Sequence, residues 1–376
     1  MRVLIAGGGT GGHLFPGIAL AEEVATRHPK NDVIFVGTNR GLEARVVPAS
    51  GFRFEAIPSR GLKGMGAVKL LLGLLTLPLS FLAAVGILRR YRPDVVVGVG
   101  GYSSGPVVMA AWLMRLPTAI QEQNSLPGLT NRILGKVVQS IFLTFEDSKA
   151  FFAAAKCHVI GNPIRRKLME NFLNSKTAHE RFSLLVFGGS LGAKGLNARV
   201  LDAFGHLGEL KDSLHVVHQT GKADLEAAKA RYAELGVSAD VREFIDDMSE
   251  AYARADLVVC RAGATSIAEL TVCKKASILV PFPFATDDHQ AKNAQSLVDA
   301  GAAVMFREAE LTGEKLAAEI KRLAGDPKAL AKMEKAAGLL GRPEAAKELA
   351  DVLVEMMIGR WGPSGRSRPK LEEVKS

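Results

Sequence analysis

The sequence has few of the residues that mark several classes of protein. Its only cysteines, Cys157, Cys260 and Cys273, show no C-x-x-C spacing in 376 residues, which argues against a disulfide scaffold or a structural zinc site. Charged residues make up 23% and hydrophobic residues 48%, so a disordered chain is excluded. No charged segment followed by an apolar run opens the sequence, so we expect no secretory signal and a reducing cytoplasmic compartment.

Several nucleotide-binding signatures are missing as well. Neither glycine-rich turn ends in G-K-[ST], so a Walker loop is absent. Residues 7–12 formally match G-x-G-x-x-G, but residues 36–40, at the end of the second expected strand, contain no carboxylate that could hold a ribose. The sequence therefore disfavours a nicotinamide-dependent oxidoreductase. It also contains no D-x-D motif, and we expect neither a metal nor another cofactor.

Two glycine-rich turns, at residues 7–12 and 188–192, are the main feature that is present. Each turn directly follows a short apolar strand. A turn of this kind ends a parallel strand and opens a helix, so that unpaired backbone N–H groups and the positive end of the helix dipole face an anion. Two such turns facing each other would form a cleft for a phosphorylated ligand.

Strand and helix patterns alternate along the whole chain at the spacing of βαβ units. The expected strands lie near residues 2–6, 32–37, 52–57, 94–98, 117–121, 140–144, 157–160, 183–187, 214–218, 240–244, 256–260, 277–281 and 303–306. The predicted fold class is α/β, with two Rossmann-like domains whose parallel sheets face each other across a cleft.

The same patterns divide the chain into four parts. Residues 1–162 are the expected N-terminal domain and residues 163–340 the C-terminal domain, with a polar, unpatterned stretch from residue 168 to 181. Residues 341–360 form a helix that we expect to pack back on the N-terminal domain. Residues 361–376 are rich in Pro, Gly, Ser and charge, and are expected to be a disordered tail.

Positive charge is concentrated in one region of a chain whose net charge is +9. Between residues 56 and 121 there are seven basic residues and one acid, and residues 70–88 carry no charge, which is long enough to span a bilayer. Because this segment lies between two strands of one parallel sheet, we expect a crossover helix instead. Its apolar sides and basic ends favour contact of residues 60–92 with an anionic membrane surface, with plain core packing as the alternative. No nucleic-acid-binding motif is present.

Two residues in the first half are candidates for proton transfer. His13 directly follows the first turn at a helix start, where glycines leave room around the imidazole for a substrate hydroxyl. The same sequence pattern would also fit a histidine that only caps the helix. Glu122 ends a predicted strand, at the sheet edge where open α/β sheets bind ligands, and is the second candidate for proton transfer or substrate orientation.

A strand, a glycine turn and a helix start follow one another again in the second half. Ala264, Thr265 and Ser266 can offer N–H groups to a pyrophosphate, and Glu269, about one turn later, can hold two ribose hydroxyls. Gln290 opens a further helix and can bind the hydroxyls of a sugar. Each of these residues also fits an ordinary helix start, because acids are favoured near helix N-termini.

A series of short motifs, in order over residues 1–300, resembles glycosyltransferase family 28. The motifs are GGTGGH at 8–13, VGVGGY at 97–102, EQN at 122–124, GNPIR at 161–165, GGS at 188–190, FIDDM at 244–248 and CRAGA at 260–264. They are most similar to those of the bacterial enzymes that transfer N-acetylglucosamine from UDP-N-acetylglucosamine to undecaprenyl-pyrophosphoryl-N-acetylmuramyl-pentapeptide, called lipid I, in peptidoglycan synthesis.

The resemblance implies a GT-B fold, with the lipid acceptor on the N-terminal domain and the UDP-sugar mainly on the C-terminal one. It implies an inverting transfer with His13 or Glu122 as the base, by a peripheral enzyme on the cytoplasmic face of the bacterial cell membrane. The substrate-binding residues that it implies are Thr10, Gly11, Gly12, Asn124, Arg165, Ser190, Ile245, Ala264, Thr265, Ser266, Glu269 and Gln290. His289 departs from the family pattern, which has a glutamine there, and this puts one sugar contact in doubt.

Two other functions stay open at this point. A UDP-N-acetylglucosamine 2-epimerase shares the fold and the donor but needs no lipid surface. A membrane-docked, non-catalytic subunit that binds a nucleotide sugar is the second alternative. The sequence carries no mark of the oligomeric state.

Overall fold

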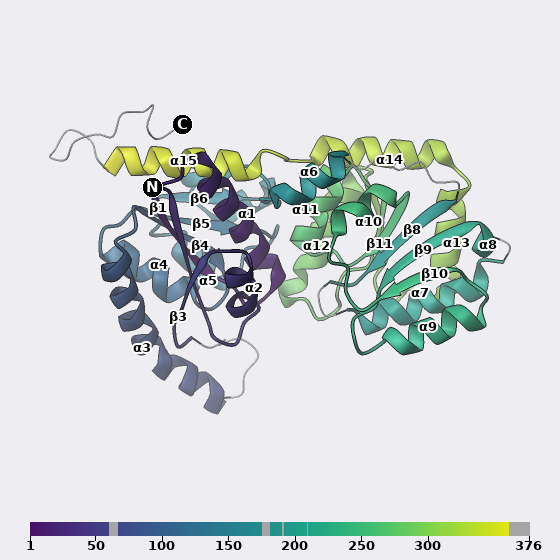
Figure 1. The fold of residues 1–376 in the computed structure, drawn as a ribbon, viewed down its shortest axis with the longest axis horizontal. Helices are drawn as coiled ribbons and strands as arrows, with labels where there is room; N and C mark the ends of the chain where they lie inside the picture. The colour runs from purple at the N-terminus through teal and green to yellow at the C-terminus, as the bar shows by residue number, and fades with distance from the viewer. Residues whose placement is uncertain (60–66, 175–180, 190–191, 209, 361–376) are drawn as a thin grey trace. The chain divides into compact units, whose positions relative to one another are not determined.

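The computed structural model describes residues 1–59, 67–174, 181–189, 192–208 and 210–360 (Figure 1). The chain forms two compact units: unit 1 runs from Met1 to Arg166 and resumes at Pro343, and unit 2 runs from Lys167 to Arg342. Each unit contains one parallel sheet with helices between its strands, which confirms the predicted pair of Rossmann-like α/β domains. The predicted disordered tail lies outside the described residues.

Unit 1 is built on a seven-stranded parallel sheet in the order β3-β2-β1-β4-β5-β6-β7. Its strands are β1 (Arg2–Gly7), β2 (Asp32–Gly37), β3 (Arg53–Ala56), β4 (Val95–Gly100), β5 (Thr118–Glu122), β6 (Ser140–Leu143) and β7 (Cys157–Val159). Its helices are α1 (Gly11–Arg27), α2 (Glu43–Ala49), α3 (Ala67–Tyr91), α4 (Ser104–Leu113), α5 (Leu129–Leu134) and α15 (Ala345–Arg360), with the short 3-10 helices η1 (Glu146–Phe151) and η2 (Ala154–Lys156).

Helices cover both faces of this sheet. Val3 and Ile5 of β1 join a core with α1 and α15, whereas Leu4 and Ala6 join a second core with α3 and α4. Successive residues of a strand point to opposite faces, so the nearly continuous apolar strands are explained by burial on both sides. Helix α3 connects β3 to β4, which confirms the crossover helix predicted for residues 70–88.

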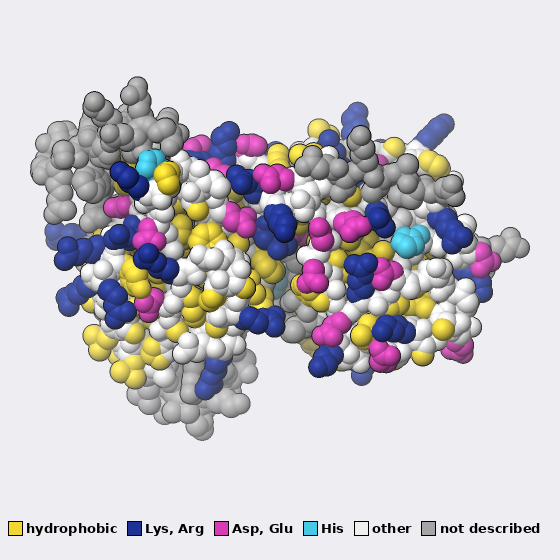
Figure 2. Space-filling model, viewed as in Figure 1, with side chains coloured by type: hydrophobic (Ala, Val, Ile, Leu, Met, Phe, Trp, Pro, Cys, Tyr) yellow, Lys and Arg dark blue, Asp and Glu magenta, His cyan; other side chains and the backbone are white. Residues whose placement is uncertain are grey.

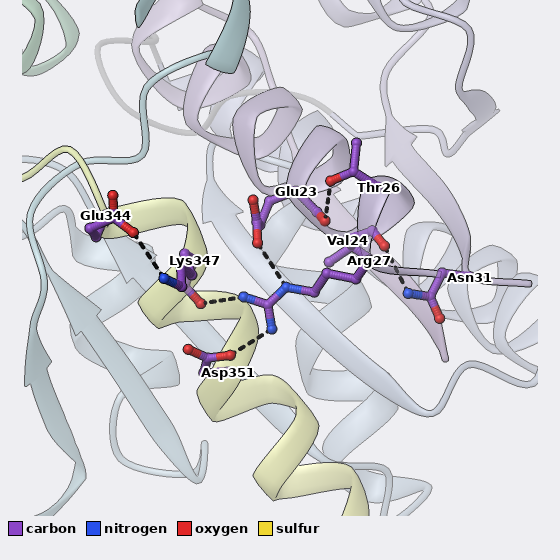
Figure 3. A network of polar contacts seen from close by, with 8 residues as sticks. All are labelled: Glu23, Val24, Thr26, Arg27, Asn31, Glu344, Lys347 and Asp351. Atoms are coloured by element: carbon purple, nitrogen blue, oxygen red, sulfur yellow. Dashed lines mark hydrogen bonds and ion pairs between the residues drawn. The ribbon is translucent and has the colours of Figure 1, made fainter. Parts of the chain in front are cut away.

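The C-terminal helix α15 belongs to unit 1 and packs against α1 (Figure 3). Arg27, at the end of α1, donates to Oδ1 of Asp351 at 2.7 Å and to the carbonyl of Lys347 at 2.8 Å. Glu23, one turn earlier in α1, accepts from Nε of Arg27 at 2.8 Å. Together with the buried Leu349, these contacts fix the end of the chain on its first helix.

Unit 2 is built on a six-stranded parallel sheet in the order β10-β9-β8-β11-β12-β13. Its strands are β8 (Phe182–Phe187), β9 (Leu214–Gln219), β10 (Ala239–Arg242), β11 (Leu257–Cys260), β12 (Ser277–Leu279) and β13 (Ala303–Met305). Its helices are α6 (Arg166–Asn174), whose first residue ends unit 1, α7 (Lys194–His206), α8 (Leu210–Ser213), α9 (Leu225–Glu234), α10 (Met248–Arg254), α11 (Ala264–Val272), η3 (Thr286–Asp288), α12 (His289–Asp299), α13 (Gly313–Ala324) and α14 (Pro327–Leu340).

Helix α6 corrects one prediction. The sequence predicts no regular structure after residue 168, but the chain is helical up to Asn174. Leu168 and Phe172 lie four residues apart on one side of this helix, Leu168 is buried, and the Phe172 ring lies 5.8 Å from the ammonium of Lys275. The helix has only nine residues, so its apolar spacing covers little more than two turns of an otherwise polar segment.

The two sheets share the topology that positions a ligand site. In each of them the strand order reverses beside the first strand, between β1 and β4 and between β8 and β11. Open parallel sheets bind ligands outside the carboxyl ends of the strands at such a switch point. Because each glycine-rich turn follows the first strand of its sheet, each turn lies at this point of its own unit.

Candidate active site

The first glycine-rich turn is held from two sides. The N–H of Gly8 donates to the carbonyl of Gly100 at the end of β4, at 3.3 Å, and the N–H of Gly9 donates to the carboxylate of Glu43 at 2.7 Å. Gly9 has a φ of 92°, which favours glycine, and a Cβ on Gly8 would lie 2.3 Å from the Glu43 carboxyl carbon. The glycines therefore allow two neighbours to approach the turn closely.

Glu43 is a site residue that the sequence reasoning missed. It opens α2, is 1% exposed, and also accepts from the N–H and the hydroxyl of Thr38 at 3.0 and 2.9 Å. Gly37 and Gly41 enclose it, since a Cβ on either would lie within 2.5 Å of its side chain. Residues 36–40 indeed contain no carboxylate, but the helix that follows supplies one. The available signal was the pair of glycines between the end of β2 and Glu43, Gly37 and Gly41.

Thr10, Gly11 and Gly12 complete the turn and begin α1. The carbonyl of Thr10 accepts from the N–H groups of His13 and Leu14 at 3.2 and 3.1 Å. Within the described residues, the N–H groups of Thr10, Gly11 and Gly12 themselves donate to no acceptor, as is usual in the first turn of a helix. Unlike the N–H of Gly9, they are open to a substrate.

His13 lies half-buried in the first turn of α1, and its Nδ1 is 3.0 Å from Oε1 of Gln123, the residue after β5. Space for the imidazole comes from β4, because a Cβ on Gly100 would lie 2.6 Å from Nδ1 of His13. A Cβ on Gly12 would meet only Thr10. The room around the ring therefore depends on a glycine from another strand, and not on the neighbouring glycines that the sequence suggests.

Glu122, the other candidate base, is 1% exposed at the end of β5. Its Oε1 accepts from the backbone and side-chain N–H groups of Asn124 at 3.0 and 3.3 Å. Its Oε2 accepts from the N–H of Gly128 at 3.0 Å and from Nδ2 of Asn131 at 2.9 Å. Four donors fill the carboxylate, so this geometry suits a residue that orients Asn124 and the following loop.

Arg165 lies near the end of unit 1, beside α1. Its guanidinium stacks over the ring of Phe15, 4.8 Å from the centroid. Its Nε is buried and has no hydrogen-bond partner among the described residues. A guanidinium that is held flat, with N–H groups still to satisfy, is suited to bind a phosphate.

The second glycine-rich turn is described in part, since Ser190 and Leu191 lie outside the described residues. The carbonyl of Gly189 accepts from Nε2 of Gln219, at the end of β9, at 2.7 Å. Oε1 of the same side chain accepts from the N–H of Ile245 at 3.4 Å, and the Ile245 side chain is 1% exposed. One neutral amide thus links this turn to the segment that contains Ile245.

The first turn of α11 follows β11 at the switch point of unit 2. Ala264, Thr265 and Ser266 form this turn, after Gly263 as the N-cap residue. The hydroxyl of Thr265 is buried and has no hydrogen-bond partner among the described residues. A helix N-terminus with an unused hydroxyl is suited to a phosphate group.

Glu269 lies one turn further along α11 and is 8% exposed. Its Oε2 accepts from the hydroxyl of Tyr252, on α10, at 3.0 Å. Tyr252 is itself fully buried, and its ring packs edge-on against Phe187, the last residue of β8, with 6.0 Å between the ring centroids. A side chain of the core therefore helps to orient the Glu269 carboxylate.

Gln290 lies in the first turn of α12. Its Oε1 accepts from the N–H of Phe282 at 2.9 Å, which leaves its amide nitrogen to donate to another group. The adjacent His289 directs Nδ1 to the carbonyl of Thr286 at 2.8 Å. The side chain of His289, the residue that departs from the family pattern, therefore forms a hydrogen bond at the start of its own helix.

Unit 1 also carries exposed apolar side chains beside basic ones, over α3 and α4; we call this the α3–α4 surface (Figure 2). Its exposed apolar residues are Leu77, Leu79, Leu82, Trp112 and Leu113, and its exposed basic residues are Arg89, Arg90, Arg92 and Arg115. Ala84, Ile87 and Leu88 of the same helix are buried, so α3 is apolar on two sides. None of the helices in the described part of the chain has the length and hydropathy that crossing a bilayer requires.

Family models match both halves of the chain. The N-terminal domain model of glycosyltransferase family 28 matches residues 3–143, and the C-terminal domain model of the same family matches residues 183–349. A protein of Myxococcus xanthus is 67% identical over all of this chain and 98% of its own length, and one of Anaeromyxobacter dehalogenans is 61% identical over 98% and 96%. Both are named UDP-N-acetylglucosamine--N-acetylmuramyl-(pentapeptide) pyrophosphoryl-undecaprenol N-acetylglucosamine transferase.

A solved structure supports the same family. MurG of Acinetobacter baumannii has a TM-score of 0.76 and 31% identity, over 94% of this chain and 99% of its own. UDP-GlcNAc 2-epimerase of Neisseria meningitidis has a TM-score of 0.69 but only 16% identity, over 94% and 100%, and so shares the fold alone. The expected GT-B fold is confirmed, and the chain belongs to glycosyltransferase family 28.

Proposed function

We propose that this protein transfers N-acetylglucosamine from UDP-N-acetylglucosamine to the 4-hydroxyl of the muramyl residue of lipid I, forming a β-1,4 link with inversion. The main support for the proposal is the similarity, over the whole length of the chain, to proteins that are named as N-acetylglucosamine transferases acting on this lipid substrate. The epimerase alternative rests on a shared fold alone, and a non-catalytic role leaves the open N–H groups and the imidazole of unit 1 without a purpose.

In unit 1, His13 acts as the general base. Its ring lies at the carboxyl end of β1, next to the open N–H groups of Thr10, Gly11 and Gly12. The imidazole takes the proton of the acceptor hydroxyl as the oxygen attacks the anomeric carbon and the bond to UDP breaks. Glu122 holds Asn124 toward the N-acetylglucosamine, in agreement with the four hydrogen bonds that its carboxylate accepts.

In unit 2, the donor nucleotide binds along α11 and the second glycine-rich turn. The N-terminus of α11, with Thr265 and Ser266, holds the pyrophosphate, and Glu269 holds the ribose hydroxyls. Ile245 contacts the uracil, Gln290 the sugar hydroxyls, and Ser190 a phosphate. Arg165 binds a substrate phosphate through its stacked guanidinium, and an electrostatic contact of this kind typically contributes about 10²- to 10³-fold in rate.

The test is transfer of labelled N-acetylglucosamine to lipid I by the purified protein. We expect His13→Ala to lower kcat by about 10²- to 10⁴-fold, the usual contribution of a general base. His28→Ala, at the other end of α1, is the matched control and should stay within about twofold. Turnover of UDP-N-acetylglucosamine without a lipid acceptor would instead indicate an epimerase, and equal kcat for wild type and His13→Ala at saturating acceptor would remove His13 from the reaction.

The α3–α4 surface is the part that we propose to contact the anionic cytoplasmic leaflet, which makes the enzyme a peripheral membrane protein. Leu79 and Leu82 are 59% and 65% exposed, and Arg89 and Arg90 lie at the end of the same helix. Apolar side chains that enter the interface beside guanidinium groups that meet lipid phosphates form a membrane-binding surface.

Sedimentation with vesicles tests this surface. The double substitution Leu79→Glu and Leu82→Glu should abolish most binding to vesicles that contain anionic lipid, while transfer to a short-chain, water-soluble acceptor is retained. Leu339→Glu in α14 is the control, because Leu339 is 74% exposed but lies in unit 2. Unchanged vesicle binding by the double variant would exclude this surface as the membrane contact.

A further inference from the structure

Three buried amide side chains form a directed chain of hydrogen bonds behind the half-buried His13. Nδ1 of His13 faces Oε1 of Gln123 at 3.0 Å, and Nε2 of Gln123 donates to Oε1 of Gln121 at 3.3 Å. Nε2 of Gln121 in turn donates to Oδ1 of Asn162 at 2.8 Å. Gln123, Gln121 and Asn162 are each no more than 2% exposed, so water does not compete for these contacts.

The direction of this chain is fixed by a backbone carbonyl. Nε2 of Gln123 also donates to the carbonyl of Val99, in β4, at 2.9 Å. A carbonyl oxygen can only accept, so the group that faces Val99 must be the amide nitrogen of Gln123. The other end of the same amide, the oxygen Oε1, must then face His13.

From this direction we infer that Gln123 is a positioning residue that fixes the tautomer of His13. An amide oxygen can only accept, so the neutral imidazole must carry its proton on Nδ1 in order to donate to Oε1 of Gln123. Nε2 then carries the lone pair. Among the described residues no group forms a hydrogen bond to Nε2 of His13, so this lone pair is open to a substrate.

The inference rests on the function proposed above and identifies the atom of His13 that accepts the proton. Nε2 of His13 accepts the proton of the acceptor hydroxyl, the hydroxyl oxygen forms the new bond to the anomeric carbon, and the bond from that carbon to the β-phosphate oxygen breaks, its electron pair leaving with UDP. The proton added at Nε2 makes an imidazolium whose Nδ1–H still donates to Gln123. With the opposite tautomer, Nε2–H would meet the hydroxyl and no base would be present.

Gly100 adds an independent constraint on the ring. A Cβ at this position would lie 2.6 Å from Nδ1 and 2.9 Å from Cε1 of His13, and the φ of Gly100 is 93°. The ring edge that carries Nδ1 is therefore enclosed between Gly100 and Gln123. This packing holds Nδ1 against the amide oxygen and limits rotation of the ring.

Nitrogen NMR of the ¹⁵N-histidine-labelled protein tests the tautomer without any substrate. The chain has eight histidines, and the signals of His13 are those that disappear in His13→Gln. At a pH where the ring is neutral, we expect a protonated Nδ1 and an unprotonated Nε2. A protonated Nε2 in the wild-type protein would overturn the inference, whatever activity the protein shows.

Variants of Gln123 connect the tautomer with catalysis. Gln123→Met, which is similar in length but has no amide, should give a mixture of tautomers and lower kcat about tenfold or more, with the donor KM within about twofold. Gln123→Glu keeps an acceptor for Nδ1–H, so the tautomer and part of kcat should be rescued. Because the new carboxylate favours the imidazolium, the pH below which kcat falls should move upward.

Gln121→Met is the matched control. It removes a buried amide from the same strand but leaves the oxygen of Gln123 and the carbonyl of Val99 in place, so the His13 tautomer should be unchanged. If both methionine variants lose the same activity and neither alters the tautomer, Gln123 has only a structural role and the inference is wrong. If the wild-type protein transfers no sugar but its His13 is protonated on Nδ1, the proposed function fails and the tautomer assignment stands.

Discussion

The two units place a glycine-rich turn at the same point of the same kind of sheet but hold it with opposite chemistry. In unit 1 the carboxylate of Glu43 accepts from the N–H of Gly9, whereas in unit 2 the amide of Gln219 donates to the carbonyl of Gly189. A buried carboxylate beside a turn repels a second anion, and a neutral amide does not. We therefore propose that the first turn favours an uncharged hydroxyl group, instead of the phosphate that the sequence pattern predicts, and that the second turn favours a diphosphate.

The largest effect that this comparison predicts is for Glu43. In Glu43→Gln, an amide NH₂ replaces one carboxylate oxygen, so a donor faces either the N–H of Gly9 or the N–H and hydroxyl of Thr38. The turn must shift, and we expect kcat to fall about 10²-fold, the scale of a displacement of about 1 Å near reacting groups. Steady-state transfer kinetics measure this fall, and the affinity for UDP in a calorimetric titration should change little.

A second acid of unit 1 provides the control for Glu43. Glu55, in β3, accepts from the hydroxyl of Tyr91 at 2.6 Å and from Arg90 at 3.2 Å, away from the turn. Glu55→Gln should keep kcat within about twofold. If Glu43→Gln also retains full activity, or loses UDP binding in unit 2, the contrast between the two turns does not hold.

The sequence predicted the sheets well but not the contacts between strand ends. Every expected strand is present near its expected place, because short valine-rich runs such as Val95 to Val99 are typical of strands buried on both faces of a parallel sheet. His13 and Glu122 were predicted as candidates because His13 directly follows the first glycine-rich turn and Glu122 lies at the end of a strand. Glu43 and Gln123 act through long-range partners, Gly9 and the ring of His13, and no local pattern specifies such a partner.

The next effect in size concerns the strand that holds the second turn. His218, beside Gln219 in β9, is fully buried, accepts at Nδ1 from the hydroxyl of Tyr232 at 2.9 Å and donates from Nε2 to Asn197 at 3.2 Å. Burial lowers the pKa of His218 from 6.5 to about 4. The unfolded chain therefore binds this proton more readily, so the stabilisation is complete above about pH 6.5 and is lost as the pH falls toward 4.

We expect unit 2 to lose about 2 kcal/mol from this group between pH 7 and pH 5, since each pH unit below 6.5 contributes about 1.4 kcal/mol. Calorimetric unfolding at the two pH values, compared between wild type and His218→Gln, isolates the contribution from that of the other histidines. The variant should show the smaller difference between pH 7 and pH 5. An equal difference in both proteins would mean that His218 is not the group that is protonated.

The smallest predicted effect concerns the specificity of unit 2 for a ribonucleotide. In Tyr252→Phe, the Glu269 carboxylate loses the hydroxyl that donates to its Oε2 at 3.0 Å, while the ring can keep its contact with Phe187. A carboxylate that has lost this donor is held less firmly and binds the two ribose hydroxyls less well. We measure the inhibition constants of UDP and 2′-deoxy-UDP in the transfer assay. We expect the ratio of these two constants, which gives the preference for UDP, to fall about fivefold, the equivalent of about 1 kcal/mol for one hydrogen bond, with kcat nearly unchanged.

Tyr232→Phe separates this specific effect from a general loss of stability. Tyr232 is also buried in unit 2, and its hydroxyl also has a single described partner, the Nδ1 of His218, which lies outside the candidate site. Both substitutions should lower the melting temperature, but only Tyr252→Phe should change the ratio of the two inhibition constants. If both variants keep the wild-type ratio, the hydroxyl of Tyr252 does not contribute to ribose binding by Glu269.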